Sequence, residues 1–245
     1  MARGTGFAWR CGAYSMSATD RFPKAVVFDL DGTLVDSAAD IARAINAGFE
    51  LFGIPPFTTK DVHALVGSGA AAAVQRAATA AGLALTEVQH SLVLRRFFDK
   101  YAEVSAEGNG LYPGARNLLV GLRARGVRTG LCTNKAEPIA HIALKALGIA
   151  DLFDVTVGAR DDRPRKPFPD MIRACIDPIG VIPQHAIMIG DSKADVGAAR
   201  AAGMPVILTS FGYSTIPISD LAPDAVVEHL DEIMDWLPRL IKLPS

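Results

Sequence analysis

The sequence predicts an α/β protein in which a doubly wound parallel sheet is interrupted by a block of helices. From residue 111 onward, apolar strand-like runs alternate with helical stretches, which is the pattern of β–α–β units and a parallel sheet. Between residues 37 and 110 the pattern is helical, without a convincing strand. We therefore expect an α/β core of residues 21–36 and 111–245, with a helical domain of residues 37–110 inserted after the first strand.

The first strand is expected at residues 24–30, because the run KAVVFDL is β-branched, aromatic and short. An amphipathic helix is expected at 37–53, where apolar residues recur at spacings of three and four. Ser37 is suited to begin this helix and Gly53 to end it. Three further helices of the inserted block are expected at residues 59–66, 69–82 and 86–108, before the stretch LYPGA at 111–115.

The second half of the chain supplies the rest of a Rossmann-like core. Its strands are expected at residues 127–133, 153–159, 185–191 and 204–210. Helices are expected between them at residues 117–126, 137–148, 168–180 and 193–203. Pro178 is expected to end the third of these helices, since proline removes a backbone donor. The stretches 224–230 and 232–241 close the chain.

Composition excludes several classes of protein. The chain has 245 residues and a formal net charge of −1, without a block of Lys and Arg, so nucleic acid is not an expected partner. No apolar run approaches the ~18 residues that a membrane span needs. Three widely spaced cysteines fit a reducing compartment, which favours a cytoplasmic protein.

The N-terminal stretch is expected to lie outside the folded core. Residues 1–20 are rich in Gly, Ala and Ser and have no continuous apolar segment typical of a secretory signal. We therefore interpret them as an extension, and a translation start at Met16 is one hypothesis for its origin.

Polar motifs follow the expected strands at the points where the strands end. In chain order they are DLDGTLVDS (29–37), CTNK (132–135), RKPFPD (165–170) and GDSKAD (190–195). In open α/β sheets the ligand crevice lies beyond the carboxyl ends of the strands. We therefore expect Asp29, Thr133 and Asp191 to converge on one edge, with Lys166 on a nearby loop.

The residue types at this edge indicate a site for a metal ion and a phosphate group. They comprise one ammonium, one hydroxyl and the carboxylates of Asp29, Asp31, Asp191 and Asp195. Hard oxygen ligands suit Mg²⁺. A carboxylate at the end of a buried strand is also unfavourable unless something pairs with it.

The four motifs, in this order, resemble those of the haloacid dehalogenase-like phosphohydrolases. The helical block resembles the α-helical cap domain of that family, and the resemblance runs from about residue 24 to the C-terminus. Several strings, among them LVGSGAAAAVQRA, CTNKAEPI and GDSKADVGAARAAGMPVI, are most similar to the phosphoglycolate phosphatases of the family. Lys193 and Ala194 depart from the residues common in the last motif, but its two acids are kept.

The resemblance implies a role for each carboxylate of the first motif. Asp29 is expected to attack phosphorus and form an aspartyl-phosphate. Asp31 is expected to protonate the leaving oxygen and then to deprotonate the attacking water. Dehalogenases of similar fold lack this second acid, so Asp31 favours a phosphatase.

The other site residues are expected to hold the metal and the phosphate. The resemblance implies Mg²⁺ on the Asp29 and Asp191 side chains and the Asp31 carbonyl, while Mn²⁺ and Co²⁺ remain open alternatives. Asp195 would orient water or Lys166. Phosphate is expected to be bound by Thr133, Asn134 and Lys166, and Arg76 of the cap is a candidate for a substrate carboxylate.

The predicted function is Mg²⁺-dependent hydrolysis of a small phosphomonoester, foremost 2-phosphoglycolate to glycolate and phosphate. A sugar phosphate or pyrophosphate is an alternative substrate for the same chemistry. A phosphosugar mutase resembling β-phosphoglucomutase is a second alternative. A non-enzymatic binding protein is disfavoured because Asp29 and Asp31 are both present. The sequence leaves open whether the chain is a monomer or a homodimer.

Overall fold

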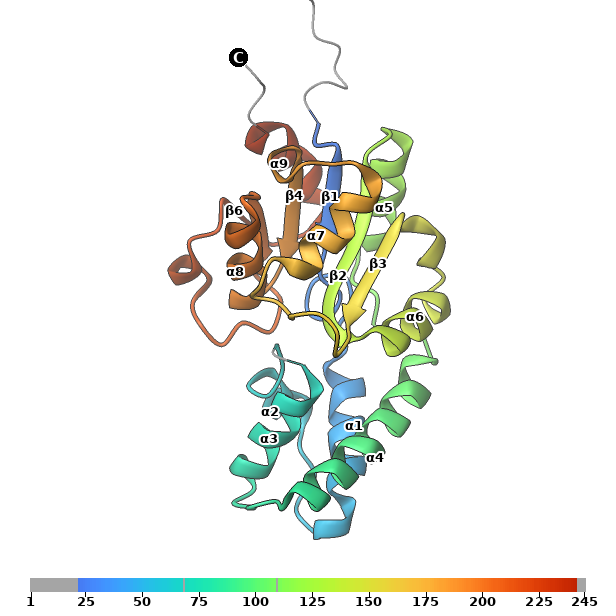
Figure 1. Ribbon diagram of the computed structural model, residues 1–245, viewed down its shortest axis with the longest axis vertical. Coiled ribbons are helices and arrows are strands. Elements are labelled where there is room, and N and C mark those ends of the chain that lie inside the picture. The colour runs from blue at the N-terminus through green and yellow to red at the C-terminus, as the bar shows by residue number, and fades with distance from the viewer. Residues whose placement is uncertain (1–21, 68, 109, 242–245) are drawn as a thin grey trace, which may run out of the picture.

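The computed structural model describes residues 22–67, 69–108 and 110–241 (Figure 1). The predicted extension at residues 1–20, with the hypothesis of a start at Met16, lies outside the described residues. Figure 1 shows two parts, a sheet with helices on both faces and a group of helices beyond one end of the strands.

The core is a sheet of six strands in the order β3-β2-β1-β4-β5-β6, and every pairing within it is parallel. The strands are β1 (Ala25–Phe28), β2 (Arg128–Ala136), β3 (Val155–Ala159), β4 (Ala186–Gly190), β5 (Val206–Thr209) and β6 (Ala225–Val227). The chain runs from β1 outward to β3 and then returns to β4 on the other side of β1. This reversal confirms the predicted doubly wound α/β fold and places its switch point between β1 and β4.

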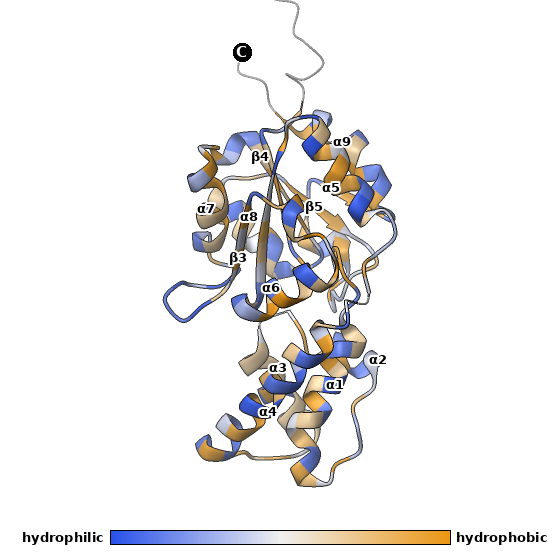
Figure 2. Cartoon of the chain, turned by 90° about the vertical axis from the view of Figure 1, so that its right-hand side faces the viewer, coloured by the Kyte–Doolittle hydropathy of each residue, from blue (hydrophilic) through white to orange (hydrophobic). Residues whose placement is uncertain are grey.

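Alternate residues of β1 enter different layers, as the two-residue period of a strand requires. Val26 and Phe28 pack with one layer, and Ala25 and Val27 pack with the other. The first layer contains α5 (Ala115–Ala124), α6 (Glu137–Ala146) and α9 (Ile233–Leu240), and the second contains α7 (Asp170–Ile176) and α8 (Lys193–Ala202). Because both faces are covered, the central strands β1 (AVVF) and β4 (AIMIG) have no polar side chain. Figure 2 shows the helices on the two sides of the sheet, coloured by hydropathy.

The helices inserted between β1 and β2 form the cap and share an apolar core of their own. They are α1 (Ala38–Phe49), η2 (Glu50–Phe52), α2 (Thr59–His63), α3 (Ala70–Ala80) and α4 (Glu87–Ser105). Gly48 of α1 lets α4 approach closely, since a Cβ at this position would lie 3.0 Å from Val93. The cap lies at the carboxyl ends of the strands, toward which the arrows in Figure 1 point.

The start of α1 is held by the core domain more than by its own cap residue. Ser37 occupies the N-cap position as predicted, but its side chain makes no capping hydrogen bond. The backbone N–H of Ala38 instead donates to Asp36 Oδ1 (3.3 Å) and to the hydroxyl of Tyr213 (3.0 Å). The loop after β5 therefore fixes the point at which the chain enters the cap.

Proline and glycine end two of the predicted helices where expected. The helix expected at 168–180 ends as α7 at Ile176, and Pro178 lies in the following turn η4 (Asp177–Ile179). The helix expected at 37–53 finishes as η2, after which Gly53 adopts a φ of 61°. The other 3₁₀ turns are η3 (Ala150–Leu152), η5 (Pro183–His185), η6 (Ile218–Leu221) and η7 (Leu230–Glu232). In the described part of the chain, no helix combines the length and the apolar character that crossing a bilayer requires.

Candidate active site

The predicted site residues gather at the switch point of the sheet. Asp29 directly follows β1 and Asp191 directly follows β4, the strand paired with β1. Thr133 lies in the second half of β2, which pairs with the opposite side of β1. Because the carboxyl ends of parallel strands share one edge, the topology brings these three side chains together.

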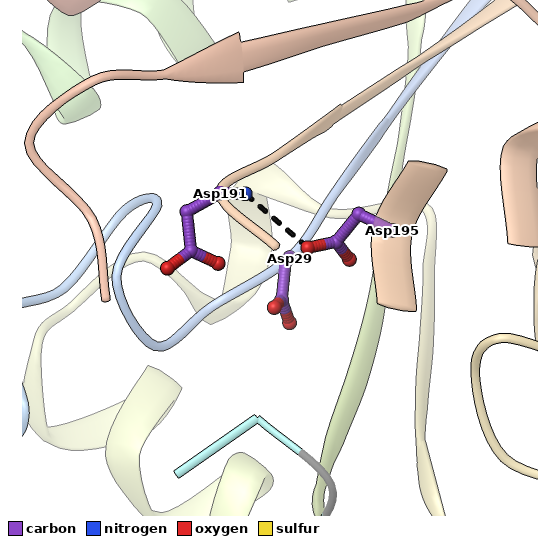
Figure 3. Close-up of side chains that lie close together, drawn as sticks. All are labelled: Asp29, Asp191 and Asp195. Atoms are coloured by element: carbon purple, nitrogen blue, oxygen red, sulfur yellow. Dashed lines mark hydrogen bonds between the residues drawn. The ribbon is translucent and has the colours of Figure 1, made fainter. Parts of the chain in front are cut away.

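A cluster of three buried carboxylates lies at the centre of the site. Asp29, Asp191 and Asp195 each offer an oxygen atom, and these atoms lie within 4.8 Å of one another (Figure 3). The ammonium of Lys166, from the loop after β3, lies 3.0 Å from Asp29 Oδ1 and 2.7 Å from Asp195 Oδ1. One positive charge thus faces three carboxylates, which leaves the cluster with an excess of negative charge.

The pKa values of the cluster reflect this excess. Burial raises the pKa of Asp29 to about 7; the Lys166 charge opposes the rise, and the charges of Asp195 and Asp31 add to it. Burial and the charges of Asp195 and Asp29 also raise the pKa of Asp191. Burial alone would lower the pKa of Lys166, but attraction to Asp195 and Asp29 raises it, so this side chain stays protonated.

Asp195 connects the other residues of the site through hydrogen bonds. Its Oδ1 accepts from Lys166, and its Oδ2 accepts from the Asp191 N–H (3.2 Å; Figure 3), the Ser192 N–H (3.0 Å) and the Ser192 hydroxyl (2.6 Å). Asp195 also closes a capping box with Ser192 at the start of α8. Both oxygens are therefore occupied by protein donors.

Asp29 and Asp191 each keep one oxygen for another partner. Asp29 Oδ1 accepts from the Leu30 N–H (2.7 Å) and from Lys166, and Asp191 Oδ2 accepts from the Tyr213 N–H (2.6 Å). Asp29 Oδ2 and Asp191 Oδ1 receive no hydrogen bond from the described residues. Two free carboxylate oxygens in a buried cluster of excess negative charge fit a metal cation.

The turn after Asp29 depends on a glycine. Gly32 has a φ of 81°, and a Cβ at this position would lie 2.3 Å from Asp191 Oδ2. The turn closes with a hydrogen bond from the Gly32 N–H to the Val35 carbonyl (2.8 Å). A side chain at residue 32 would therefore strain the backbone and displace a carboxylate of the cluster.

Asp31 lies outside the carboxylate cluster and has a cation of its own. The Lys135 ammonium lies 3.0 Å from Asp31 Oδ1, contacts the hydroxyl of Tyr101 and sits 4.0 Å from the centre of the Tyr101 ring. Tyr101 belongs to α4, so this contact joins the cap to the core. Lys135 belongs to the motif CTNK, and a charged residue at the end of a buried strand is a sequence signal of the same kind as Asp29.

Asn134 holds two segments that lie against the site. Its amide oxygen accepts from the Lys166 N–H (3.1 Å), and its Nδ2 donates to the Lys166 carbonyl (3.1 Å) and to the Gly67 carbonyl of the cap (3.2 Å). Thr133 is buried beside it, and its Oγ1 accepts from the Lys135 N–H (3.2 Å). The predicted binding of phosphate by Thr133 and Asn134 stays a prediction.

Tyr213 is a site residue that the sequence motifs do not indicate. Its backbone N–H donates a hydrogen bond to Asp191 Oδ2, and its hydroxyl donates to Asp36 Oδ1 (2.7 Å). The centre of its ring lies 4.9 Å from that of the His63 ring in the cap. Nothing in the loop sequence signals this, because loops lack the periodicity that assigns side chains to a face.

A cavity of about 340 Å³ lies between the cap and the strand ends. Its lining includes Asp29, Asp31 and Asp191 from the core and Phe97, Phe98 and Tyr101 from the cap. This size and mixture of apolar walls with a few convergent polar groups is typical of a site for a small metabolite.

Arg76 also lines this cavity, but its guanidinium has contacts within the cap. Its Nε (2.9 Å) and Nη2 (2.5 Å) donate to the Leu65 carbonyl, and Nη2 also reaches the Val66 carbonyl (3.3 Å). These bonds hold the end of the segment after α2. The predicted contact of Arg76 with substrate is not tested by them and stays a prediction.

Fold and site together describe an α/β domain whose carboxylate-lined cavity lies under a helical cap. Residues 26–209 match the family model of the haloacid dehalogenase-like hydrolases, and the chain belongs to this family.

Its relatives point to one group within the family. The chain is 42% identical to a phosphoglycolate phosphatase of Rhodospirillum rubrum over 219 residues, covering 88% of this chain and 91% of the relative. It is 33% identical to a phosphoglycolate phosphatase of Escherichia coli O157:H7 over 232 residues, covering 87% and 92%. Among solved structures, a predicted phosphoglycolate phosphatase from Haemophilus somnus superposes with a TM-score of 0.79 at 32% identity, covering 88% and 97%.

Proposed function

We propose that this chain, a phosphatase of the haloacid dehalogenase-like family, hydrolyses 2-phosphoglycolate to glycolate and phosphate with Mg²⁺ as its cofactor. The observation that carries the proposal is that Asp29, which lines the capped cavity together with Asp31, pairs with Lys166 (3.0 Å). The substrate is inferred from the names of the relatives and from the small size of the cavity.

In the first step, a carboxylate oxygen of Asp29 attacks phosphorus and the bond from phosphorus to the leaving oxygen breaks. Asp31 gives its proton to that oxygen, and glycolate departs. The phosphoryl group is left as an ester of Asp29. The ammonium of Lys166, held by Asp195, offsets the charge of the phosphoryl oxygens throughout this step.

In the second step, water attacks phosphorus, Asp31 takes a proton from it, and the bond between phosphorus and Asp29 breaks. This returns both carboxyl groups to their starting states and releases phosphate, so atoms and protons balance over the cycle. The apolar cap residues Phe97 and Phe98 keep bulk water from the cavity during the first step.

Asp29, Asp191 and the backbone carbonyl of Asp31 would hold Mg²⁺ in this proposal. When bound, the ion supplies the positive charge that the carboxylate cluster lacks and allows an anionic substrate to approach an anionic nucleophile. Mn²⁺ and Co²⁺ bind similar ligands, so the three ions should be compared.

The proposal is tested by phosphate release from 2-phosphoglycolate, glucose 1-phosphate, glucose 6-phosphate and pyrophosphate, with Mg²⁺ and then with EDTA. We expect 2-phosphoglycolate to lead by about tenfold or more in kcat/KM, and EDTA to abolish release. A higher kcat/KM for another ester would agree with the proposed chemistry but refute 2-phosphoglycolate as the substrate. Interconversion of sugar phosphates without phosphate release would favour the mutase alternative instead.

We further propose that the enzyme acts in the cytoplasm, where glycolate formation would remove a phosphorylated two-carbon acid. The small number of cysteines supports this placement, and the two in the described residues, Cys132 and Cys175, are buried free thiols. Detection of the protein in an oxidising compartment by cell fractionation would contradict it.

A further inference from the structure

Resting on the proposed function, we propose that Lys135 binds the carboxylate of the substrate and thereby determines specificity, with Tyr101 holding its ammonium in place. Lys135 lines the cavity, yet its side chain is only 2% exposed. A lysine charge buried to this extent is unfavourable unless partners compensate it, so its surroundings indicate what it binds.

The ammonium of Lys135 has room for one more partner. It has three N–H donors. One is directed to Asp31 Oδ1 (3.0 Å) and one to the Tyr101 hydroxyl, and the third has no acceptor among the described residues. Burial raises the pKa of Tyr101 well above its usual value, so Tyr101 stays a neutral phenol that does not itself balance the lysine charge.

The distance between Lys135 and Asp31 suits a substrate whose carboxylate is one carbon away from the leaving oxygen. In the proposed mechanism the leaving oxygen lies against Asp31, and Lys135 lies 3.0 Å from the same carboxylate. With C–C and C–O bonds of about 1.5 Å, a carboxylate on the adjoining carbon lies roughly 3 Å from the leaving oxygen. An anion at that position comes within hydrogen-bond reach of Lys135 Nζ.

The other cations of the cavity are less suited to this task. In the described part of the chain, Arg76, Lys135 and Lys193 line the cavity. Arg76 donates to the Leu65 and Val66 carbonyls, and Lys193 is exposed. Lys166 is held by Asp29 and Asp195 on the side of the phosphoryl group. Lys135 is therefore the buried cation on the side of the leaving group.

A matched pair of substrates separates recognition of the carboxylate from catalysis. Ethyl phosphate has a methyl group where 2-phosphoglycolate has its carboxylate, and the reacting atoms are the same. We would measure kcat/KM for both substrates with wild type, Lys135→Met and, as control, Lys193→Met. The preference for 2-phosphoglycolate should fall by roughly 10- to 100-fold in Lys135→Met, the scale of one charge-assisted hydrogen bond, and should stay unchanged in Lys193→Met.

A lysine that only positions Asp31 would give a different result. Both substrates would then lose activity by the same factor in Lys135→Met, and the inference would be wrong. Thermal unfolding checks that each variant is folded. Tyr101→Phe is the milder second variant, and we expect it to reduce the same preference by roughly threefold, because a neutral hydrogen bond is the weaker kind.

The outcomes for wild type and variants distinguish the two proposals. A wild type that hydrolyses other esters but shows no preference for 2-phosphoglycolate over ethyl phosphate refutes the proposed substrate and this subsite together. A wild type with a clear preference that survives both Lys135→Met and Tyr101→Phe refutes the role of Lys135 alone.

Discussion

Replacement of Asp191 by Asn should stabilise the metal-free protein while abolishing its response to metal. Asp191 is buried within 4.8 Å of the carboxylate oxygens of Asp29 and Asp195, and Lys166 compensates only part of their charge. Asn keeps the shape of the side chain and an oxygen for the Tyr213 N–H, but carries no charge. It therefore resembles the protonated acid, the form that this environment favours.

The expected magnitude follows from the geometry. Two unit charges 4.8 Å apart repel by about 3.5 kcal/mol at an effective dielectric constant of about 20. Asp191 has two such neighbours, and the more weakly acting Lys166 charge offsets at most one of them. The weaker hydrogen bond from Tyr213 to a neutral amide subtracts about 1 kcal/mol. A gain of at least about 2.5 kcal/mol remains, which corresponds to a rise in Tm of roughly 5–10 °C for a chain of this size.

Thermal unfolding at about pH 8, in EDTA and in excess Mg²⁺, measures both effects. Wild type should gain roughly 2.7 kcal/mol from Mg²⁺ at a hundred times its Kd, and Asp191→Asn should gain almost nothing. Asp195→Asn is the matched control. It should lose stability in EDTA by about 3 kcal/mol, because it leaves Lys166 with one buried partner fewer. An Asp191→Asn variant that is less stable than wild type in EDTA, or that still responds to Mg²⁺, would refute the reasoning.

Three further substitutions test the rest of the site. Asp29→Asn should reduce phosphate release by about 10⁴-fold or more in a stopped assay, since it removes the proposed nucleophile, and a residual rate near wild type would contradict that role. Asn134→Ala should lower the free energy of unfolding by about 2–3 kcal/mol in a urea titration, because the Lys166 loop and the Gly67 carbonyl lose their shared partner; an unchanged midpoint would count against this. Arg76→Ala should lower Tm by a few degrees and leave KM for 2-phosphoglycolate within about twofold of wild type, whereas a large rise in KM would support the predicted contact with substrate.

The sequence was sufficient to predict how the carboxylates of the core come together. Asp29 and Asp191 directly follow apolar runs that we interpreted as buried strands, and parallel strands end at a common edge. Their convergence thus follows from topology and needs no knowledge of individual side chains. The same reasoning placed Lys166 near them, on the loop after β3, the strand that pairs with β2.

Contacts between the cap and the core could not be predicted in this way. Tyr101 lies on the apolar side of α4, where helical periodicity makes it look like any other core residue. Its contact with Lys135 depends on where the cap sits over the strand ends, which sequence patterns do not encode. Tyr213 belongs to a loop, which has no periodic pattern of side chains, so the sequence did not indicate that its N–H would donate to Asp191.

The core residues that contact the proposed catalytic groups also contact the cap. Asn134 bonds both the Lys166 backbone and the Gly67 carbonyl of the cap. Lys135 bonds Asp31 and Tyr101. If the cap moved away, Asn134 would lose its bond to Gly67 and Lys135 would lose its bond to Tyr101. Because Asn134 and Lys135 have all of these partners only when the cap is in place, the proposed mechanism links enclosure of the substrate to assembly of the site.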